Sequence, residues 1–71
     1  MTLFGPRYPC LRRVVVNTKG GSAIRGLLWE RKGRYLVLRE ADLLAPRAAP
    51  TPMDGEVAIP VDNVEFMQVV G

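Results

Sequence analysis

The sequence of 71 residues contains no histidine and a single cysteine, Cys10. One cysteine cannot form an intramolecular disulfide, and one thiol without histidine cannot build an ordinary zinc site. The usual general base is also missing, and no residue that would activate the thiol lies beside Cys10 in the sequence. The acidic residues after position 35 lack metal-ligand spacing. We therefore expect no enzymatic activity, no catalytic residues, no metal and no cofactor.

Long apolar runs are absent too. The sequence has no stretch of about 18 apolar residues, which is the length that a membrane-spanning helix needs. Its first residues, Met-Thr-Leu-Phe-Gly-Pro, lack the basic-then-apolar layout of a secretory signal. We expect a protein without a membrane partner that stays in the cytoplasm of the producing cell.

The length leaves room for one small domain. A chain of this size buries only about 60% of the surface that its unfolded form exposes, so it is marginally stable by itself. Disulfides and metals are already excluded as stabilising devices. Oligomerisation is the device that remains, and we expect copies of the chain to associate with one another.

The net charge of +3 is distributed unevenly along the chain. Residues 1–34 hold eight of the ten basic residues and one acid, whereas residues 35–71 hold two basic residues and six acids. This asymmetry allows a basic face for phosphate or two complementary faces through which copies meet. The third interpretation is that folding mixes the two sets as ordinary surface ion pairs.

Residues 1–10 are predicted to form an extended arm rather than a helix. Pro6 and Pro9 fix φ and push the residues before them toward extended geometry. Leu3, Phe4 and Tyr8 are the apolar side chains of this arm, and we expect them to lie against the protein's own domain or against a partner.

The remaining sequence predicts five short strands separated by turns. The strands are expected at residues 11–17, 23–31, 35–40, 56–59 and 64–70. Asp42–Leu44 form either a helical turn or an extension of the third strand, and the extension is the favoured interpretation. In the second strand Ile24, Gly26 and Leu28 share one face, and a glycine inside a strand marks a strong bend or a close backbone approach. In the last strand simple alternation places Val64 with Phe66 and opposite Met67.

Turn signals separate these strands. Gly20 and Gly21 lie in the first turn, Arg31–Arg34 form a basic second turn, and residues 45–55 form a loop with three prolines that ends in Asp-Gly. No helical periodicity is present. The sequence therefore predicts an all-β fold: a small, strongly bent, five-stranded barrel over residues 11–70.

The order of the apolar and glycine motifs resembles one known family. The motifs are Val14–Val16, Gly21, Gly26–Leu28 and Leu36–Leu38, followed after the proline loop by Gly55–Phe66. This order resembles the two-part motif of Sm-like proteins over about residues 11–70. The resemblance implies an Sm-like barrel of the SH3-like kind.

The same resemblance implies rings in which the fourth strand of one copy pairs with the fifth strand of the next. In this chain the edges would be the strands at residues 56–59 and 64–70. The residues expected at these oligomer edges are Val57, Ile59, Val64, Phe66 and Met67.

The chain departs from the family where the family binds RNA. The resemblance implies an Asp and an Asn around the loop before the third strand and an Arg-Gly pair after the fourth. The matching positions here hold Arg31, Tyr35, Pro60 and Val61. The usual uridine pocket is therefore not expected.

A second resemblance is to short proteins encoded by tailed phages of actinobacteria. It lies in Gly26, Leu28, Glu30, Lys32, Gly33, Leu36–Arg39 and Asp54–Val69. It implies a component of a virion or of its assembly machinery.

Two functions follow from these observations. The first is a non-enzymatic structural module that joins copies of itself, or a larger assembly, through strand edges and the arm, as a minor virion protein would. The alternative is an Sm-like ring that binds RNA or single-stranded nucleic acid through a basic face. The basic residues available to it are Arg12, Arg13, Lys19, Arg25, Arg31, Lys32 and Arg34.

Within that basic set, Arg31, Lys32 and Arg34 are the expected phosphate contacts, because a glycine-centred turn projects them together. Arg25 and Tyr35 complete the predicted nucleic-acid site. Trp29 or Tyr35 would stack on bases, although packing is the favoured interpretation for Trp29. Solvation of the turn is the equally open alternative to phosphate binding.

Overall fold

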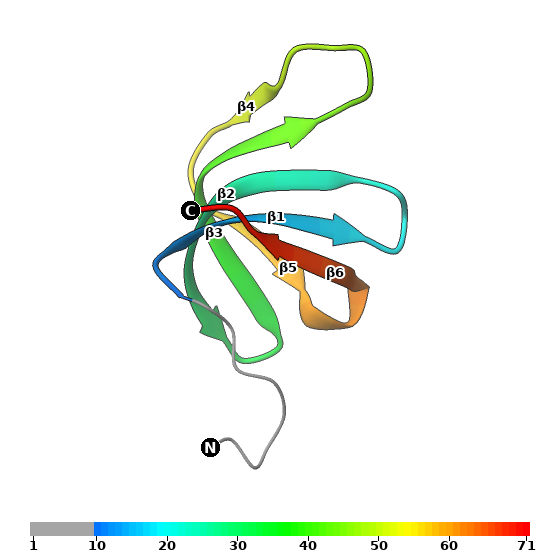
Figure 1. Ribbon diagram of the computed structural model, residues 1–71. Coiled ribbons are helices and arrows are strands. Elements are labelled where there is room, and N and C mark those ends of the chain that lie inside the picture. Colours follow the sequence, from blue (N-terminus) through cyan, green and yellow to red (C-terminus); the bar gives the residue numbers. More distant parts are fainter. Residues whose placement is uncertain (1–9) are drawn as a thin grey trace.

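The computed structural model describes residues 10–71, and all the strands in this range belong to one antiparallel sheet (Figure 1). The strands are β1 (Arg12–Thr18), β2 (Ala23–Lys32), β3 (Tyr35–Leu44), β4 (Thr51–Met53), β5 (Val57–Pro60) and β6 (Val64–Val69). One turn of 3-10 helix, η1 (Val61–Asn63), joins β5 to β6. Residues 10–71 contain no helix long and apolar enough to span a membrane.

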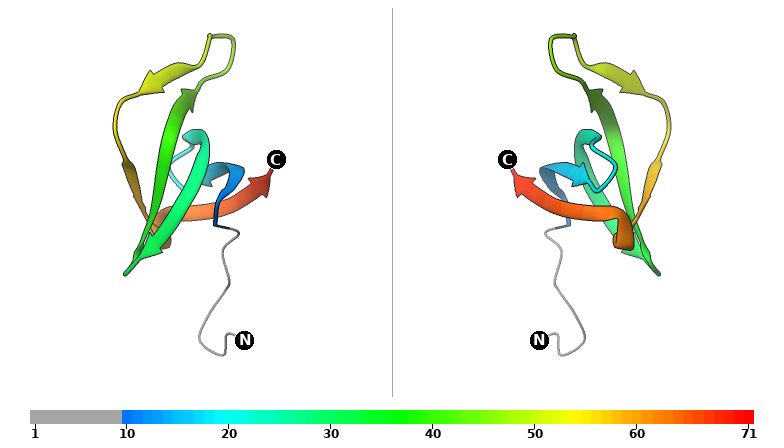
Figure 2. Two further views of the ribbon diagram at one scale, coloured as in Figure 1. Left: turned by 90° about the vertical axis from the view of Figure 1, so that its left-hand side faces the viewer. Right: turned by 90° about the vertical axis from the view of Figure 1, so that its right-hand side faces the viewer.

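The strand order is β4-β3-β2-β1-β6, and β5 pairs with β3 beside β4. The second half of β3 holds β4 and its first half holds β5, so one edge of β3 carries two short strands in succession. β3 and β6 run at a steep angle to each other, which shows how strongly the sheet bends (Figure 2). Because β5 and β6 do not pair, the bent sheet stays open between them. The all-β fold class is confirmed.

The strand count differs from the expected five. Thr51–Met53, inside the segment predicted as a loop, pair with Ala41–Leu43 and form β4. Pro50 and Pro52 concealed this strand, since prolines argue against a central strand, but a three-residue strand at a sheet edge tolerates them. The predicted extension of the third strand through Leu44 is confirmed, and it supplies the surface on which β4 pairs.

The core lies on the concave face of the bent sheet. Leu28, Leu36 and Leu38 are fully buried together with Val14 and Val16. Ile24 and Leu28 share the inner face of β2, as their alternation predicted. Val37 faces the other way in β3 but is also largely buried. The alternation predicted for β2 is therefore confirmed, and burial in β3 extends to both faces of the strand.

Gly26 sits where the sheet bends. The pairs Arg25 with Asp42 and Leu27 with Arg39 leave Gly26 opposite two residues, Glu40 and Ala41, which is a β-bulge. A Cβ on Gly26 would lie 3.1 Å from the Cα of Ala41 and 3.1 Å from the carbonyl oxygen of Arg39. The close backbone approach predicted at this glycine is thus confirmed.

The bulge requires a left-handed backbone at Glu40, whose φ is +51°. A side chain in this conformation costs about 1–2 kcal/mol, and glycine avoids that cost. We expect Glu40→Gly to be about 1 kcal/mol more stable than Glu40→Ala. Both variants lose the ion pair between Glu40 and Arg13, so the comparison isolates the backbone. Urea unfolding measures the difference, and equal stabilities would contradict it.

A second irregularity corrects the predicted faces of the last strand. Thr18 pairs with Val64 and Asn17 pairs with Phe66, so Glu65 has no partner on β1. The extra residue shifts the alternation, and Val64 packs on the core together with Met67 instead of facing outward with Phe66. The expectation for Val64 was wrong because simple alternation does not register a bulge.

Candidate nucleic-acid interface and assembly edges

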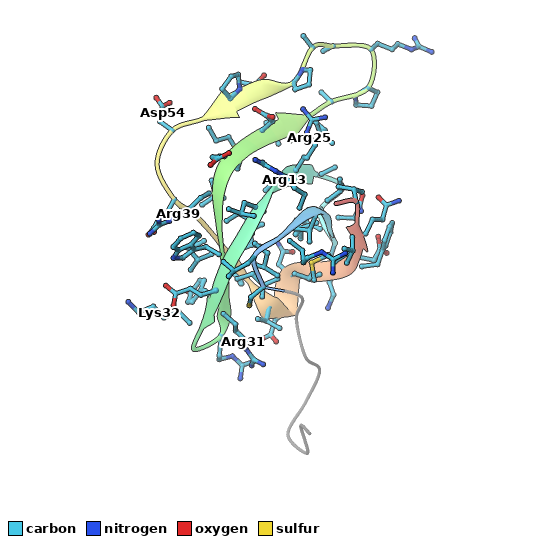
Figure 3. All side chains as sticks on the ribbon, turned by 60° about the vertical axis from the view of Figure 1, so that its left-hand side comes forward. Arg13, Arg25, Arg31, Lys32, Arg39 and Asp54 are labelled. Carbon is cyan, nitrogen blue, oxygen red and sulfur yellow. The ribbon has the colours of Figure 1, made fainter. Side chains whose placement is uncertain are left out.

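Three basic residues gather at the hairpin between β2 and β3. Arg31, Lys32 and Arg34 flank Gly33, whose φ of +59° makes the tight turn. The Nε of Arg31 donates a hydrogen bond to the carbonyl oxygen of Gly33 at 3.0 Å. All three basic side chains are exposed. Figure 3 shows Arg31 and Lys32 at the tip of this hairpin.

The 3-10 turn η1 lies directly against this hairpin. The amide of Val61 donates to the carbonyl oxygen of Arg34 at 2.8 Å, and Tyr35 pairs with Pro60. The guanidinium of Arg34 forms an ion pair with Asp62. The turn and η1 are distant in the sequence, yet they form one end of the domain.

Asp62 is a residue of this site that the sequence did not reveal. It lies in η1, directly before the last strand. Its pairing with Arg34 spans 28 positions. No local pattern signals such a contact, because it depends on how the sheet bends.

The aromatic residues near the hairpin have different surroundings. Tyr35 is 49% exposed at the start of β3. The ring of Trp29 is covered on one face by the guanidinium of Arg39, which lies 3.9 Å from the ring centroid. Arg39 is held there by Glu56 at 2.8 Å. Tyr35 is therefore the aromatic residue of this end that is available for stacking, and Trp29 packs under Arg39.

Arg25 does not belong to the hairpin cluster. It lies near the other end of β2 and pairs with Asp42 at 3.0 Å, and Figure 3 shows it well away from Arg31 and Lys32. Arg13 is bound to Glu40 at 2.7 Å. Lys19 lies closer to the site, because its amide donates to the carbonyl oxygen of Asn63 at 2.8 Å.

The uneven charge of the sequence is largely mixed by folding. In the described part of the chain, four ion pairs join arginines to acids, and three of them connect the basic first half to the acidic second half. The interpretation of intermixed surface pairs accounts for these residues. Lys32 makes no ion pair within residues 10–71, so positive charge remains at the hairpin.

The predicted edge residues fall into two groups. The side chains of Val57, Ile59, Val64 and Met67 pack on or in the core, and Ile59 is only 3% exposed. Phe66 is 53% exposed on the outer side of β6. The backbone edges of β5 and β6 are each paired on one side only. The arm residues Leu3, Phe4 and Tyr8 lie outside the described residues.

No pocket is found among residues 10–71. The same range contains no group of three or more Cys, Asp or Glu residues arranged to hold a metal ion. In this part of the chain, the candidate functional surfaces are therefore the exposed hairpin end and the strand edges rather than an enclosed site.

Comparison with solved structures gives close matches of the fold. A heptameric archaeal Sm protein superposes with a TM-score of 0.74 at 22% identity, over 86% of this chain and 88% of the other. The chain has an Sm-like fold. The SmAP1 heptamer of P. aerophilum matches equally well, with a TM-score of 0.74 at 22% identity over 86% of this chain and 81% of that one.

The identity to these proteins is low, so the match concerns the Sm-like fold and not a shared activity. No family model and no curated protein matches the sequence. The Sm-like fold expected from the sequence motifs is thereby established, as an open bent sheet rather than the expected closed barrel, whereas the resemblance to phage proteins gains no support. The hairpin between β2 and β3 and the turn η1 carry the positions that the Sm resemblance linked to RNA, and they do lie together.

Proposed function

We propose that this protein assembles into an Sm-like ring that binds single-stranded RNA at the hairpin end, without enzymatic activity. The observation that carries the proposal is the joining of the basic β2–β3 hairpin to η1 through Arg34 and Val61. The two structures compared above are heptamers, and one is described for its implications for the eukaryotic snRNP core. In a ring, each copy would add one such basic end to a shared surface.

The chemistry of the hairpin favours phosphate contacts over base reading. Arg31, Lys32 and Arg34 supply cations to a backbone, and Tyr35 supplies a π-face on which any base stacks. Pro60 and Val61 replace the Arg-Gly pair that the resemblance implied, so the polar groups of a uridine pocket are missing at these positions. We therefore propose binding with strong salt dependence and weak base preference.

A salt titration tests this proposal. Fluorescence anisotropy with oligouridine, oligoadenine and a single-stranded DNA of the same length measures affinity at several salt concentrations. We expect measurable binding at low salt, similar affinities for the two RNAs and a steep loss of affinity with salt. Three single substitutions remove one cation each: Arg31→Ala, Lys32→Ala and Arg34→Ala. We expect each of them to lower the magnitude of the slope of log K against log salt by about 0.7.

Arg47 provides the matched control. It is an exposed arginine in the connection between β3 and β4, at the end of β3 opposite to the hairpin. Arg47→Ala removes the same charge from the chain and should leave the slope unchanged. Equal losses from Arg47→Ala and Lys32→Ala would show attraction by net charge alone. The absence of binding at low salt would contradict the nucleic-acid function altogether.

Asp62→Asn should strengthen binding. In the structure Asp62 is paired with Arg34 and competes with a phosphate for the same guanidinium. Removing the carboxylate frees the cation and raises the net charge of the hairpin end, so we expect affinity at low salt to rise by about three- to tenfold. Asp42→Asn, which frees Arg25 far from the hairpin, is the control and should change the affinity little. Equal gains from both variants would contradict a localised site.

Assembly is the part of the proposal that the structural module and the RNA-binding ring share. The Sm-like fold leaves one edge of β5 and one edge of β6 unpaired, and a small domain gains stability from pairing them. Light scattering of the native protein measures the mass of the particle. A monomer at every concentration would contradict the ring, whatever the result with RNA. No comparison supports a virion component.

A further inference from the structure

The hydrogen bonds of β5 reveal which of its backbone groups are free. Val61 donates to Arg34 in the same register that pairs Ile59 with Leu36. Along an antiparallel strand, alternate residues direct their amide and carbonyl to opposite sides. Val57 and Ile59 therefore bond to β3, and Ala58 and Pro60 turn their backbone groups to the open edge.

The free groups of β6 follow by the same reasoning. The amide of Val70 donates to the carbonyl oxygen of Arg13 at 2.8 Å, next to the pair of Val14 with Val69. Residues Phe66 and Gln68 therefore bond to β1. The open edge of β6 presents the amides and carbonyls of Met67 and Val69.

These two edges restrict how β6 of one copy can join β5 of another. Hydrogen-bonded pairs form only between residues whose groups face the open edges, so Met67 must lie opposite Ala58 or one of its alternate neighbours. Pro60 has no amide hydrogen and cannot complete such a pair. Met67 opposite Ala58, with Val69 opposite Glu56, gives two complete pairs.

The same register also accommodates Pro60 and the bulge residue Glu65. It places Pro60 opposite Glu65, the residue of the β6 bulge that has no partner on β1. All four residues of β5 then lie opposite residues of β6. A shift of two residues in one direction places Met67 opposite Pro60, which has no amide hydrogen to donate. A shift of two residues in the other direction extends the pairing into η1.

The register also decides which side chains meet. Opposite residues point to the same face of a sheet, so Phe66 of one copy comes opposite Ile59 of the next, and Gln68 comes opposite Val57. Phe66 is the large exposed apolar side chain near the middle of β6. Ile59 is in the core, and Val57 packs half-buried at the opening beside Leu38.

We propose that Phe66 of one copy inserts against Ile59 and Val57 of the next copy, in the register that pairs Met67 with Ala58. This inference rests on the proposed assembly and adds its register and its central contact. Phe66 closes the open side of the neighbouring sheet, which each copy leaves uncovered between β5 and β6. The shifted register would set the polar Gln68, rather than Phe66, against the buried Ile59.

Disulfide trapping tests the register. With Cys10→Ser as the background, Val57→Cys is combined in turn with Phe66→Cys, Gln68→Cys and Val70→Cys. Opposite residues in a non-hydrogen-bonded pair have Cα atoms about 4.5 Å apart, within the range of a disulfide. We expect Val57→Cys with Gln68→Cys to form covalent chains of copies under mild oxidation fastest. Each single-cysteine variant is the control for random collision.

The outcomes of disulfide trapping distinguish failure of the proposed register from failure of the proposed assembly. Fastest trapping through position 66 or 70 would overturn the register while leaving assembly intact. No trapping in any pair, with a native particle still present, would overturn pairing through these edges. If the unsubstituted protein is a monomer, the proposed assembly itself fails.

Phe66→Ala tests the contact separately. Its side chain is exposed in the single copy, so the fold should survive, and the dissociation constant of the assembly should rise by at least about tenfold. Val70→Ala, which is 55% exposed just beyond β6, is the control and should have little effect. Equal affinities of the two variants would overturn the insertion of Phe66.

Discussion

Replacing Leu28 with alanine is expected to lower the free energy of unfolding by about 2–5 kcal/mol. Leu28 is 0% exposed and lies in the core with Val14 and Leu36. Its truncation removes apolar contact and leaves a cavity that the short strands cannot collapse around. A domain of this length has a total stability of about 4–11 kcal/mol, so the loss would unfold a large part of the population.

Leu43→Ala is the control for this prediction. Leu43 lies in β3 and is 37% exposed, so the same substitution should cost less than about 1.5 kcal/mol. Urea unfolding at several protein concentrations measures both variants and separates folding from assembly. Similar losses at the two positions would contradict the core described here.

Ala58→Pro is expected to convert the assembly into folded monomers. Proline removes the amide that Ala58 directs to the open edge, and it leaves the bonds to β3 intact because these run through Val57, Ile59 and Val61. Light scattering should then show the mass of one chain, and circular dichroism should still show β-structure. An unchanged particle mass would mean that the edge of β5 is not used.

Two further substitutions control the edge prediction. Pro60→Ala adds an amide at the open edge without removing a bond, so assembly should persist. Ile59→Pro removes a hydrogen bond to β3 instead. The free energy of unfolding should fall by about 3 kcal/mol or more, and the domain should unfold. Loss of assembly in Pro60→Ala would show that the proline itself shapes the interface.

Much of the fold could be predicted because strands leave a local signature. Alternation in β2 placed Ile24 and Leu28 on one face, which the structure buries, and Gly26 marked the bend. The predicted strands and the observed ones differ by about one residue at most ends, the usual uncertainty of such boundaries. β4 was missed because its prolines resemble those of a loop, and Val64 was misplaced because a bulge leaves no local signal.

The candidate site could be predicted only in part. The cluster of Arg31, Lys32 and Arg34 follows from one short turn, so the sequence revealed it. Arg25 was grouped with them but lies at the other end of β2 and pairs with Asp42. Asp62 was not recognised as a partner of Arg34, because two charged residues 28 positions apart leave no periodic pattern in the sequence that would indicate their contact.

By itself the sequence determined that this is a small all-β domain without the residues for a disulfide or an ordinary zinc site, with most of its basic residues in positions 1–34 and three of them in one turn. These properties depend on composition and on neighbours a few positions apart. Only the tertiary structure decided which charges are neutralised, which backbone groups stay unpaired and that Phe66 is exposed beside an open sheet. The reason is physical. The bend at Gly26 and the bulges at Glu40 and Glu65 determine how strands distant in the sequence lie against one another, and this arrangement determines which strand edges stay unpaired.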